Sequence, residues 1–379
     1  MRPDPRADAL PPPEPQALAA SRALLERIAA ELAAHGNWIS FARYMELALH
    51  EPGLGYYAGG ARKLGAGGDF VTAPELSPIF GRTLARQVRE LLQPGEAILE
   101  FGAGSGALAE AVLSEIPGAQ YQILETSAEL KQRQQQRLGG KAQWLDHLPR
   151  EFRGVMIANE VVDAMPVHAM AWTNAGTMER GVCANEGQLA WSERPASASL
   201  AKHAGELEVA LPASGRYESE LNLFGRLWMR SLGRVLARGA ILVIDYGFPA
   251  REYYHPQRSM GTLACHYRHR THGDPFYLPG LQDITAHVDF SALGRAARDV
   301  DLEVLGFANQ AQFLVNCGIT ELLGAEDPSD AKRYLPLTAA AQKLLSPSEM
   351  GELFKVLAVG KGVEAPLAGF AHGDRSAAL

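Results

Sequence analysis

The most informative absences in this 379-residue sequence concern cysteine, long apolar runs and phosphate-binding loops. It contains 3 cysteines, an odd number, and no two of them are spaced as Cys-x-x-Cys. We therefore expect reduced thiols rather than a disulfide framework or a cysteine zinc site. No apolar run approaches the ~20 residues that a membrane-spanning helix needs, so we expect no membrane segment. No Gly-Lys-Ser or Gly-Lys-Thr occurs, which disfavours a Walker-type phosphate loop.

An excess of basic residues is also absent. The 43 acidic side chains outnumber the 36 basic ones, and the formal net charge is −7. This balance argues against a general nucleic-acid-binding protein. The proline-rich first residues lack the apolar centre of a secretion signal, and Asp4, Asp8 and Glu14 are acids that a mitochondrial presequence avoids. We expect a disordered tail over residues 1–16 and a cytoplasmic protein.

Short apolar strands alternate with helical segments through the middle of the chain. We predict strands at residues 97–102, 121–125, 142–145, 154–160 and 241–247. The alternation predicts a parallel, doubly wound α/β sheet, which binds ligands at the carboxyl ends of its strands, where the strand order reverses. Two later strand-like segments, 302–308 and 354–360, are expected to form an antiparallel pair.

The other segments divide the chain into regions. We expect a helical and lid-forming region at 17–92, a Rossmann-like core at 93–166 and 221–363, an inserted β-meander at 167–220, and a frayed tail at 364–379. Within the meander, Asn185-Glu186-Gly187 is typical of a turn. We interpret the histidine-rich stretch 265–276 as a loop, because its interleaved arginines and its Gly-Asp-Pro oppose a metal-binding helix, and we predict no metal site.

A glycine-rich turn follows the first strand of the core. The stretch ILEFGAGSGAL places Gly102, Ala103, Gly104 and Gly106 between a strand and a helix, where backbone N–H groups can approach a ligand. By itself the turn also satisfies the dinucleotide pattern G-x-G-x-x-G/A. It therefore leaves three interpretations: S-adenosylmethionine, a dinucleotide, or purely structural glycines.

Acids near the strand ends favour S-adenosylmethionine. Glu100, which we place inside the glycine turn, suits a cationic amino group and would repel a pyrophosphate. Glu125 ends the next strand and can accept both ribose hydroxyls, although dinucleotide folds share this feature. Asp146 follows the third strand, where an adenine amino group needs an acceptor. Asp245 also falls at a strand end.

The stretch NEVVDAMPVH after the fourth strand carries the candidates for catalysis, which are Asn159, Glu160, Asp163 and His168. It lacks the Asn/Asp-Pro-Pro-aromatic motif that binds a flipped base, so we expect no DNA substrate. Its carboxylates suit a cationic acceptor, and Glu160 could hold a guanidinium in a fork and orient the attacking nitrogen. The alternative is that Asp163 caps a helix and Glu160 is solvated.

Three further residues are candidates for the acceptor side of the site. Tyr246 lies past the fifth strand, and His287 and Asp289 belong to the stretch TAHVDF. We expect them to line the cleft, with the alternative that Asp289 caps the following helix.

Taken together, six stretches resemble the MidA-type methyltransferase family, which includes the mitochondrial complex I assembly methyltransferase. They are RYMELALHEPGLGYY (43–57), GDFVTAPELSPIFG (68–81), LEFGAGSGAL (99–108), NEVVDAMPVH (159–168), LVIDYG (242–247) and DITAHVDFSAL (283–293). The resemblance implies a class I methyltransferase fold with a seven-stranded, mostly parallel sheet and S-adenosylmethionine as cofactor. It also implies that Asp69, Phe70, Thr72 and Glu75 fold over that cofactor.

The resemblance further implies a protein substrate. In the mitochondrial member the methyl acceptor is an arginine on a complex I core subunit, which is dimethylated symmetrically. For this chain we expect arginine methylation of a respiratory complex I subunit or its bacterial equivalent. The alternatives are a small-molecule methyltransferase, a non-catalytic assembly factor that binds S-adenosylmethionine, and an NAD-dependent oxidoreductase.

Overall fold

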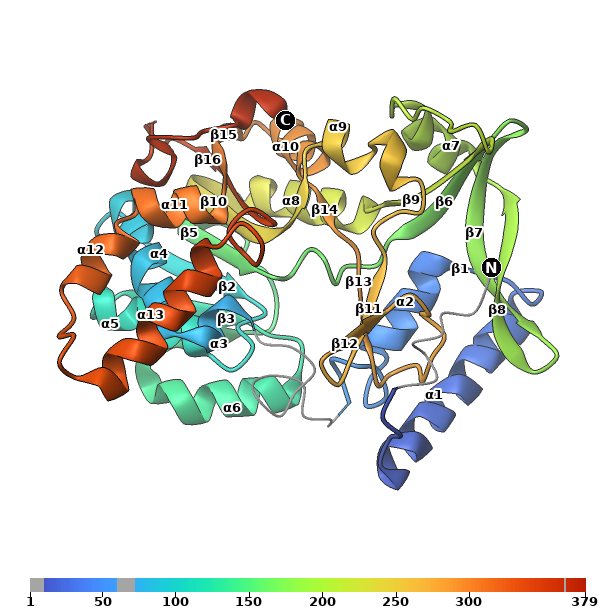
Figure 1. Ribbon diagram of the computed structural model, residues 1–379, viewed down its shortest axis with the longest axis horizontal. Coiled ribbons are helices and arrows are strands. Elements are labelled where there is room, and N and C mark those ends of the chain that lie inside the picture. Colours follow the sequence, from blue (N-terminus) through green and yellow to red (C-terminus); the bar gives the residue numbers. More distant parts are fainter. Residues whose placement is uncertain (1–9, 60–71, 365) are drawn as a thin grey trace. The chain divides into compact units, whose positions relative to one another are not determined.

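The computed structural model describes residues 10–59, 72–364 and 366–379, and these form two compact units (Figure 1). Unit 1 draws on the described parts of Met1–Phe70 and on Asp163–Gly225 and Phe248–Asp289. Unit 2 draws on the described parts of Val71–Val162 and on Arg226–Gly247 and Phe290–Leu379. Among the described residues, no helix is long and apolar enough to cross a membrane.

Unit 2 is built on one large sheet. Its path of seven strands runs in the order β15-β16-β10-β5-β2-β3-β4. From β10 to β4 all neighbours are parallel, whereas β16 is antiparallel to both β10 and β15. The predicted sheet and its antiparallel pair are therefore confirmed. The strands are β2 (Ala97–Phe101), β3 (Gln120–Leu124), β4 (Gln143–Leu145), β5 (Phe152–Asn159), β10 (Leu236–Phe248), β15 (Glu303–Asn309) and β16 (Phe354–Lys361).

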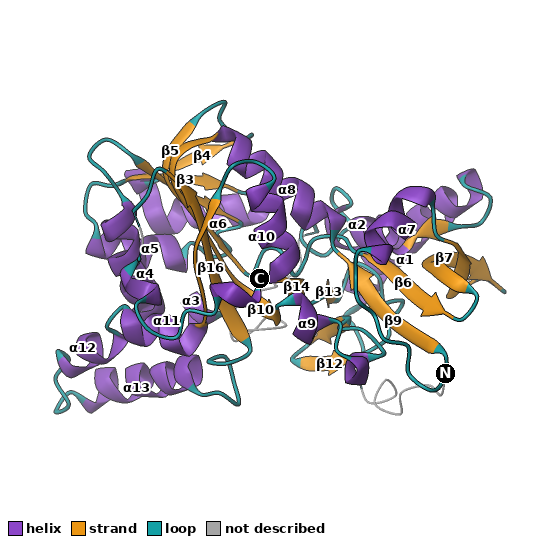
Figure 2. Cartoon of the chain, turned by 90° about the horizontal axis from the view of Figure 1, so that it is seen from above, coloured by secondary structure: helices purple, strands orange, loops and turns teal. Residues whose placement is uncertain are grey.

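Helices cover both faces of this sheet, with α4 and α5 on one face and α8 and α10 on the other (Figure 2). Helices α4 and α5 approach so closely that a Cβ on Gly81 would lie 2.6 Å from the Cβ of Ala111, which requires glycine there. The helices are α3 (Ala73–Leu76), α4 (Pro78–Leu91), α5 (Ala107–Glu115), α6 (Ala128–Leu138), α8 (Leu223–Val235), α10 (Phe290–Arg298), α11 (Gln310–Asn316), α12 (Ile319–Gly324) and α13 (Ala331–Leu345).

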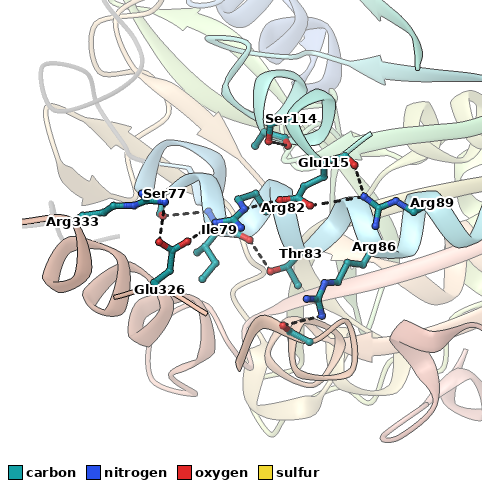
Figure 3. Close-up of polar contacts among 12 residues, drawn as sticks. Ser77, Ile79, Arg82, Thr83, Arg86, Arg89, Ser114, Glu115, Glu326 and Arg333 are labelled. Carbon is teal, nitrogen blue, oxygen red and sulfur yellow. Dashed lines mark hydrogen bonds and ion pairs between the residues drawn. The ribbon is translucent and has the colours of Figure 1, made fainter. Parts of the chain in front are cut away.

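Arginines on α4 tie this helix to its neighbours (Figure 3). Arg82 lies 2.8 Å from Glu115 of α5 and 2.8 Å from Glu326, which follows α12. Glu326 also accepts from Arg333 of α13 at 2.9 Å. The pKa of Glu326 is lowered, mainly because Arg82 hydrogen-bonds to its charged form. These contacts link α4 to α5, to the residues after α12 and to α13.

The C-terminal residues correct one expectation. We expected a frayed tail from residue 364, but Leu367 and Phe370 are buried in the core of unit 2. Phe370 packs against Phe313 with ring centroids 5.3 Å apart, and Gly369 N donates to Oε1 of Gln87 at 2.7 Å. The two apolar side chains anchor a segment whose composition is otherwise small and polar.

Unit 1 contains two antiparallel sheets. The first has the order β1-β7-β6-β9 with β8 paired to β7, and the second has the order β12-β11-β13. The hairpin from β7 to β8 turns at Glu186 and Gly187, both at positive φ, as the sequence predicts. The strands are β1 (Ile39–Ser40), β6 (His168–Thr173), β7 (Gly176–Asn185), β8 (Gln188–Pro195), β9 (Arg216–Leu221), β11 (Ala264–Tyr267), β12 (Arg270–His272) and β13 (Asp283–Thr285).

Three features of unit 1 differ from expectation. The histidine-rich stretch is not a loop but a hairpin of β11 and β12, with its turn at Arg268 and His269. The expected meander contains a helix, α7 (Ala198–Gly205), besides its strands. The grouping of segments also differs, because pairing of β11 with β13 draws 248–289 into unit 1, while α4 packs on α5 in unit 2. Unit 1 also contains the helices α1 (Pro15–Ala34), α2 (Phe41–His50) and α9 (Ala250–Tyr253).

Candidate functional site

The candidate site lies where the strand order of unit 2 reverses. Strand β2 has β3 on one side and β5 on the other. The strand order therefore runs outward in one direction from β2 through β3 to β4, and in the opposite direction from β2 through β5 to β10. Phe101 pairs with Leu124 and with Ala158, which brings the carboxyl ends of β3, β2 and β5 level. Such a point is where open α/β sheets bind ligands. The segments that follow these strands therefore form the site.

The glycine turn after β2 has the conformation that its sequence predicts. Gly102, Gly104 and Gly106 have φ angles of +58°, +55° and +81°, which side chains rarely adopt. Gly102 N donates to Leu124 O at 3.1 Å, and Gly106 directly precedes α5. The turn thus presents backbone N–H groups at a helix N-terminus, where a ligand can approach them.

Glu125 and Asp146 stand at the ends of β3 and β4, as predicted. Oε1 of Glu125 accepts from Ser127 N at 2.9 Å, so this carboxylate is held in one orientation. Asp146 is solvent-exposed and lies 3.0 Å from Nζ of Lys131, whose hydrogen bond lowers the pKa of the aspartate. Both acids thus follow neighbouring parallel strands at the carboxyl edge of the sheet, and their roles in binding a ligand stay predictions.

Glu100 lies in the predicted strand 97–102, and it does not belong to the glycine turn that follows. It lies within β2, is buried, and accepts a hydrogen bond of 2.8 Å from the hydroxyl of Tyr121 on β3. Burial raises its pKa to about 8, because the charged form loses its hydration. The carboxyl accepts its hydrogen bond from Tyr121, and its interaction with a cationic amino group stays a prediction.

Asn159 is the last residue of β5, and Glu160 directly follows it. Glu160 has a φ of +53°, and its N–H donates to Ile244 O at 2.9 Å. Its Oε1 accepts from Asn159 Nδ2 at 3.1 Å and from Ala73 N at 3.3 Å. A left-handed backbone in a residue other than glycine costs free energy, and such strain clusters at functional sites. Within the described residues, the buried Oδ1 of Asn159 has no hydrogen-bond partner, as expected of an atom that binds a ligand.

The segment beginning at Thr72 reaches both the glycine turn and Glu160. Helix α3 starts after Thr72, and its first N–H, from Ala73, is the one that contacts Glu160. The carboxylate of Glu75 accepts a hydrogen bond from the hydroxyl of Ser105 in the glycine turn. Thr72 and Glu75 therefore lie where the sequence places them, beside the candidate cofactor site. Asp69 and Phe70 lie outside the described residues.

Asp245 and Tyr246 belong to β10, which runs beside β5. Asp245 is fully buried, and its Oδ2 accepts from Val162 N at 3.0 Å while its Oδ1 accepts from Tyr246 N at 2.9 Å. It thereby holds the backbone that follows Glu160. Tyr246 is partly exposed and packs edge-on against Phe354 at 5.4 Å. The sequence marked Asp245 as a strand-end acid but did not show this supporting role.

Unit 1 contains two of the predicted catalytic residues, Asp163 and His168, and two of the predicted acceptor-side residues, His287 and Asp289. Asp163 O accepts from Ala286 N at 3.0 Å, so NEVVDAMPVH and TAHVDF meet there. His168 Nδ1 lies 3.1 Å from Oε1 of the buried Glu179. His287 N donates to Thr262 Oγ1 at 3.1 Å, and Asp289 is buried.

Two polar residues in these regions escaped the sequence analysis. Gln134 of α6 is fully buried and contacts both Gly104 and Glu125. Glu220 of β9 is buried in unit 1 and accepts from Thr262 N and from Tyr253 Oη. Burial raises the pKa of Glu220. A buried polar side chain is a signal of function or specificity, but burial of a single glutamine or glutamate is not visible in sequence.

Comparison with known proteins identifies the family to which this chain belongs. Residues 79–308 match the family described as "Putative S-adenosyl-L-methionine-dependent methyltransferase", more than half of the chain. The chain belongs to this family. A crystal structure of a Burkholderia thailandensis protein bound to S-adenosyl-homocysteine is similar to this methyltransferase, with a TM-score of 0.94 and 47% identity. The similarity covers 98% of this chain and 100% of that chain.

The similarity to relatives with a stated activity covers most of this chain. The Danio rerio "Protein arginine methyltransferase NDUFAF7, mitochondrial" is 31% identical over 89% of this chain and 87% of its own length. The Drosophila melanogaster homologue of that protein is 28% identical over 95% of this chain and 92% of its own length. S-adenosylmethionine is the cofactor, which decides between the interpretations that the glycine turn left open. The predicted α/β methyltransferase fold, with its N-terminal helices and extra antiparallel sheet, is confirmed.

The structure itself fits this cofactor. The left-handed glycines form a cradle that side chains would strain, and Glu125 lies level with it on the next strand. The buried Oδ1 of Asn159 offers an acceptor that no described side chain or backbone donor uses. In the described ranges, no group of three His, Cys, Asp or Glu side chains is placed to hold a metal ion.

Proposed function

We propose that this methyltransferase transfers a methyl group to an arginine side chain of a protein, with Glu160 as the catalytic residue. The observation that carries the proposal is the placement of Glu160, whose carboxylate stands in a strained backbone at the end of β5, beside the cofactor cradle. A guanidinium is planar and cationic, and carboxylates bind it through charge-assisted hydrogen bonds. The names of the relatives support a protein arginine as acceptor.

The cofactor supplies an electrophilic methyl group on a sulfonium when it is bound. We propose that Gly102, Ala103, Gly104 and Gly106 hold its amino acid part and that Glu125 accepts from the ribose hydroxyls. Asp146 would accept from the adenine amino group. Thr72 and Glu75 would border the cofactor and help to exclude water, and Asp69 and Phe70 remain proposed as cofactor-binding residues. Glu100, which accepts a hydrogen bond from Tyr121, would support the end of β2 that leads into the turn.

Glu160 would pair with the guanidinium and direct one nitrogen lone pair toward the methyl group. Positioning is most of the catalytic task when the electrophile is already activated. The nitrogen that gains the methyl group also loses one proton, and a carboxylate at hydrogen-bond distance can accept it. Asn159, which donates to Glu160 at 3.1 Å, would keep the carboxylate oriented.

Asp163 and His168 are proposed as further catalytic residues, and Tyr246, His287 and Asp289 as acceptor-side residues. Tyr246 offers an aromatic face to a cation, which such rings attract. His168 is oriented by Glu179, and an oriented histidine can accept a proton from a substrate. Each role predicts a weaker acceptor interaction on substitution, with unchanged cofactor affinity.

We propose a subunit of respiratory complex I, or its bacterial equivalent, as the first protein substrate to test. The experiment is incubation of the protein with a lysate of its own cells and S-adenosylmethionine labelled in the methyl group. Label in a protein band, mapped to arginine by mass spectrometry, would support the proposal. Label confined to small molecules, or no label despite intact cofactor binding, would overturn it.

A further inference from the structure

Gln134 joins three parts of the proposed cofactor site from one buried position on α6. Its Nε2 donates to Gly104 O at 3.0 Å and to Glu125 Oε2 at 2.9 Å. Its Oε1 accepts from the indole Nε1 of Trp144 at 2.9 Å. One amide therefore links the glycine turn after β2, the end of β3 and the side chain of β4.

We propose that Gln134 is a positioning residue of the S-adenosylmethionine site. It sets the orientation of the Glu125 carboxylate that receives the ribose, and it fixes the Gly104 peptide and the Trp144 ring on either side. The inference rests on the proposed roles of Glu125 and Gly104 in binding the cofactor. It goes beyond them because Gln134 itself need not touch the cofactor.

Both oxygens of the Glu125 carboxylate accept hydrogen bonds from the protein. Ser127 N holds Oε1 at 2.9 Å and Gln134 Nε2 holds Oε2 at 2.9 Å. A carboxylate oxygen accepts more than one hydrogen bond, so these contacts are compatible with the two ribose hydroxyls. A group already held in its bound orientation loses less conformational freedom on binding, which strengthens affinity.

The chemistry of the site explains why the residue is glutamine. The position needs two donors, toward Gly104 O and Glu125, and one acceptor, toward Trp144. A primary amide supplies both donors and the acceptor without net charge. An ionised glutamate would offer no donor and would repel Glu125, whereas a lysine would offer no acceptor to the indole.

The same helix provides a matched control. Gln136 lies two residues further along α6 and is exposed. Gln134→Met and Gln136→Met make the same chemical change in the same helix, one at the junction and one at the surface. Gln134→Glu is a second variant of nearly identical shape.

The test measures affinity for S-adenosylmethionine by calorimetry, together with KM for it, kcat at its saturation, and thermal unfolding. We expect Gln134→Met to weaken the affinity roughly tenfold, the size of one lost hydrogen bond to a charged group. KM for the cofactor should rise with kcat nearly unchanged, while Gln136→Met behaves as the wild type. Unchanged affinity in Gln134→Met, or an equal loss in Gln136→Met, would overturn the inference.

Gln134→Glu keeps the test decisive if the methionine variant folds poorly. At high pH its carboxylate should weaken cofactor affinity more than the wild type shows, and affinity should recover as the pH falls and the new carboxyl gains a donor proton. A pH profile parallel to that of the wild type would overturn the inference. Glu125→Ala separates the two levels of argument. If it leaves affinity unchanged, the proposed ribose role fails; if it weakens affinity while both Gln134 variants bind normally, only the positioning role fails.

Discussion

The backbone N–H of Val162 donates a hydrogen bond of 3.0 Å to the buried carboxylate of Asp245. Val162 comes two residues after Glu160, and the second oxygen of Asp245 accepts from Tyr246 N at 2.9 Å. A single carboxylate on β10 therefore fixes the segment that carries the proposed catalytic residue. A buried carboxylate of this kind favours one backbone arrangement, because any other arrangement would leave its oxygens without hydrogen-bond donors, which costs free energy.

Asp245→Asn is expected to slow methyl transfer while leaving cofactor affinity nearly intact. Both oxygens of Asp245 accept from N–H groups, and an amide can accept with only one of its two polar atoms. One N–H would then face an NH₂ group, and the segment after Glu160 would shift. We expect a loss of roughly tenfold or more in kcat, as small misplacements cost in oriented sites. Single-turnover rates and calorimetry measure the two effects, and a wild-type rate would refute the role of Asp245.

The buried carboxyl of Glu100 predicts a pH dependence of stability. Its folded-state pKa of about 8 lies above the ordinary value of 4.5. The folded state thus binds the proton more tightly, and the stabilisation is complete below pH 4.5 and lost as the pH rises toward 8. The slope of the unfolding free energy over this window is at most about 1.4 kcal/mol per pH unit.

Glu100→Gln should remove that slope, because an amide has no proton to lose. Tyr121→Phe should do the opposite, since it removes the hydrogen bond that lowers the pKa of Glu100, and the window should extend to higher pH. Chemical denaturation of the three proteins at pH 5, 6.5 and 8 checks both. A pH slope in Glu100→Gln equal to that of the wild type would show that this carboxyl is not responsible.

Gly104→Val is expected to lose cofactor binding. Gly104 has a φ of +55°, and a side chain with a branched Cβ is strained there by about 1–2 kcal/mol or more. The added atoms would also occupy the space beside the proposed methionine moiety. Gly140→Val is the control, because a Cβ there meets nothing within 4 Å. Calorimetry that found wild-type affinity in Gly104→Val would exclude the turn as the cofactor cradle.

The ion pairs of α4 predict an asymmetry in stability. Arg82 bridges Glu115 and Glu326, with side-chain exposures of 25%, 24% and 10%, whereas Arg333 is 69% exposed and contacts Glu326. Arg82→Ala should therefore lower the unfolding free energy by about 1 kcal/mol, and Arg333→Ala by less, because solvent screens exposed pairs. Urea denaturation compares the two. Equal losses of unfolding free energy in the two variants would mean that the two ion pairs of Arg82, drawn in Figure 3, stabilise the protein no more than the exposed pair of Arg333 and Glu326 does.

Much of the architecture was predictable because strand and helix periodicity alternate regularly from Ala97 to Asp245. The predicted ends of those strands place Gly102, Glu125 and Glu160 on one edge of the sheet, as the structure does. Motif spacing was enough here because parallel strands bring their carboxyl ends together.

What the sequence could not show depends on orientation and burial. Glu100 falls in the predicted strand 97–102, but the sequence did not show that its carboxyl is buried against Tyr121. Gln134 is one of several glutamines in α6, and only the packed helix distinguishes it from its exposed neighbours. The tail after residue 364 looked polar, yet Leu367 and Phe370 are enough to anchor it.

The central claim is that Glu160 serves methyl transfer and not cofactor binding. Its most direct test compares Glu160→Gln with the wild type in two assays of the same preparations: calorimetry with S-adenosylmethionine, and transfer of labelled methyl groups to lysate protein. We predict an affinity within roughly threefold of the wild type, since less than 1 kcal/mol is at stake. Transfer to arginine should fall by roughly a hundredfold or more, because the charge that orients the acceptor is gone. Wild-type transfer by Glu160→Gln would contradict the account.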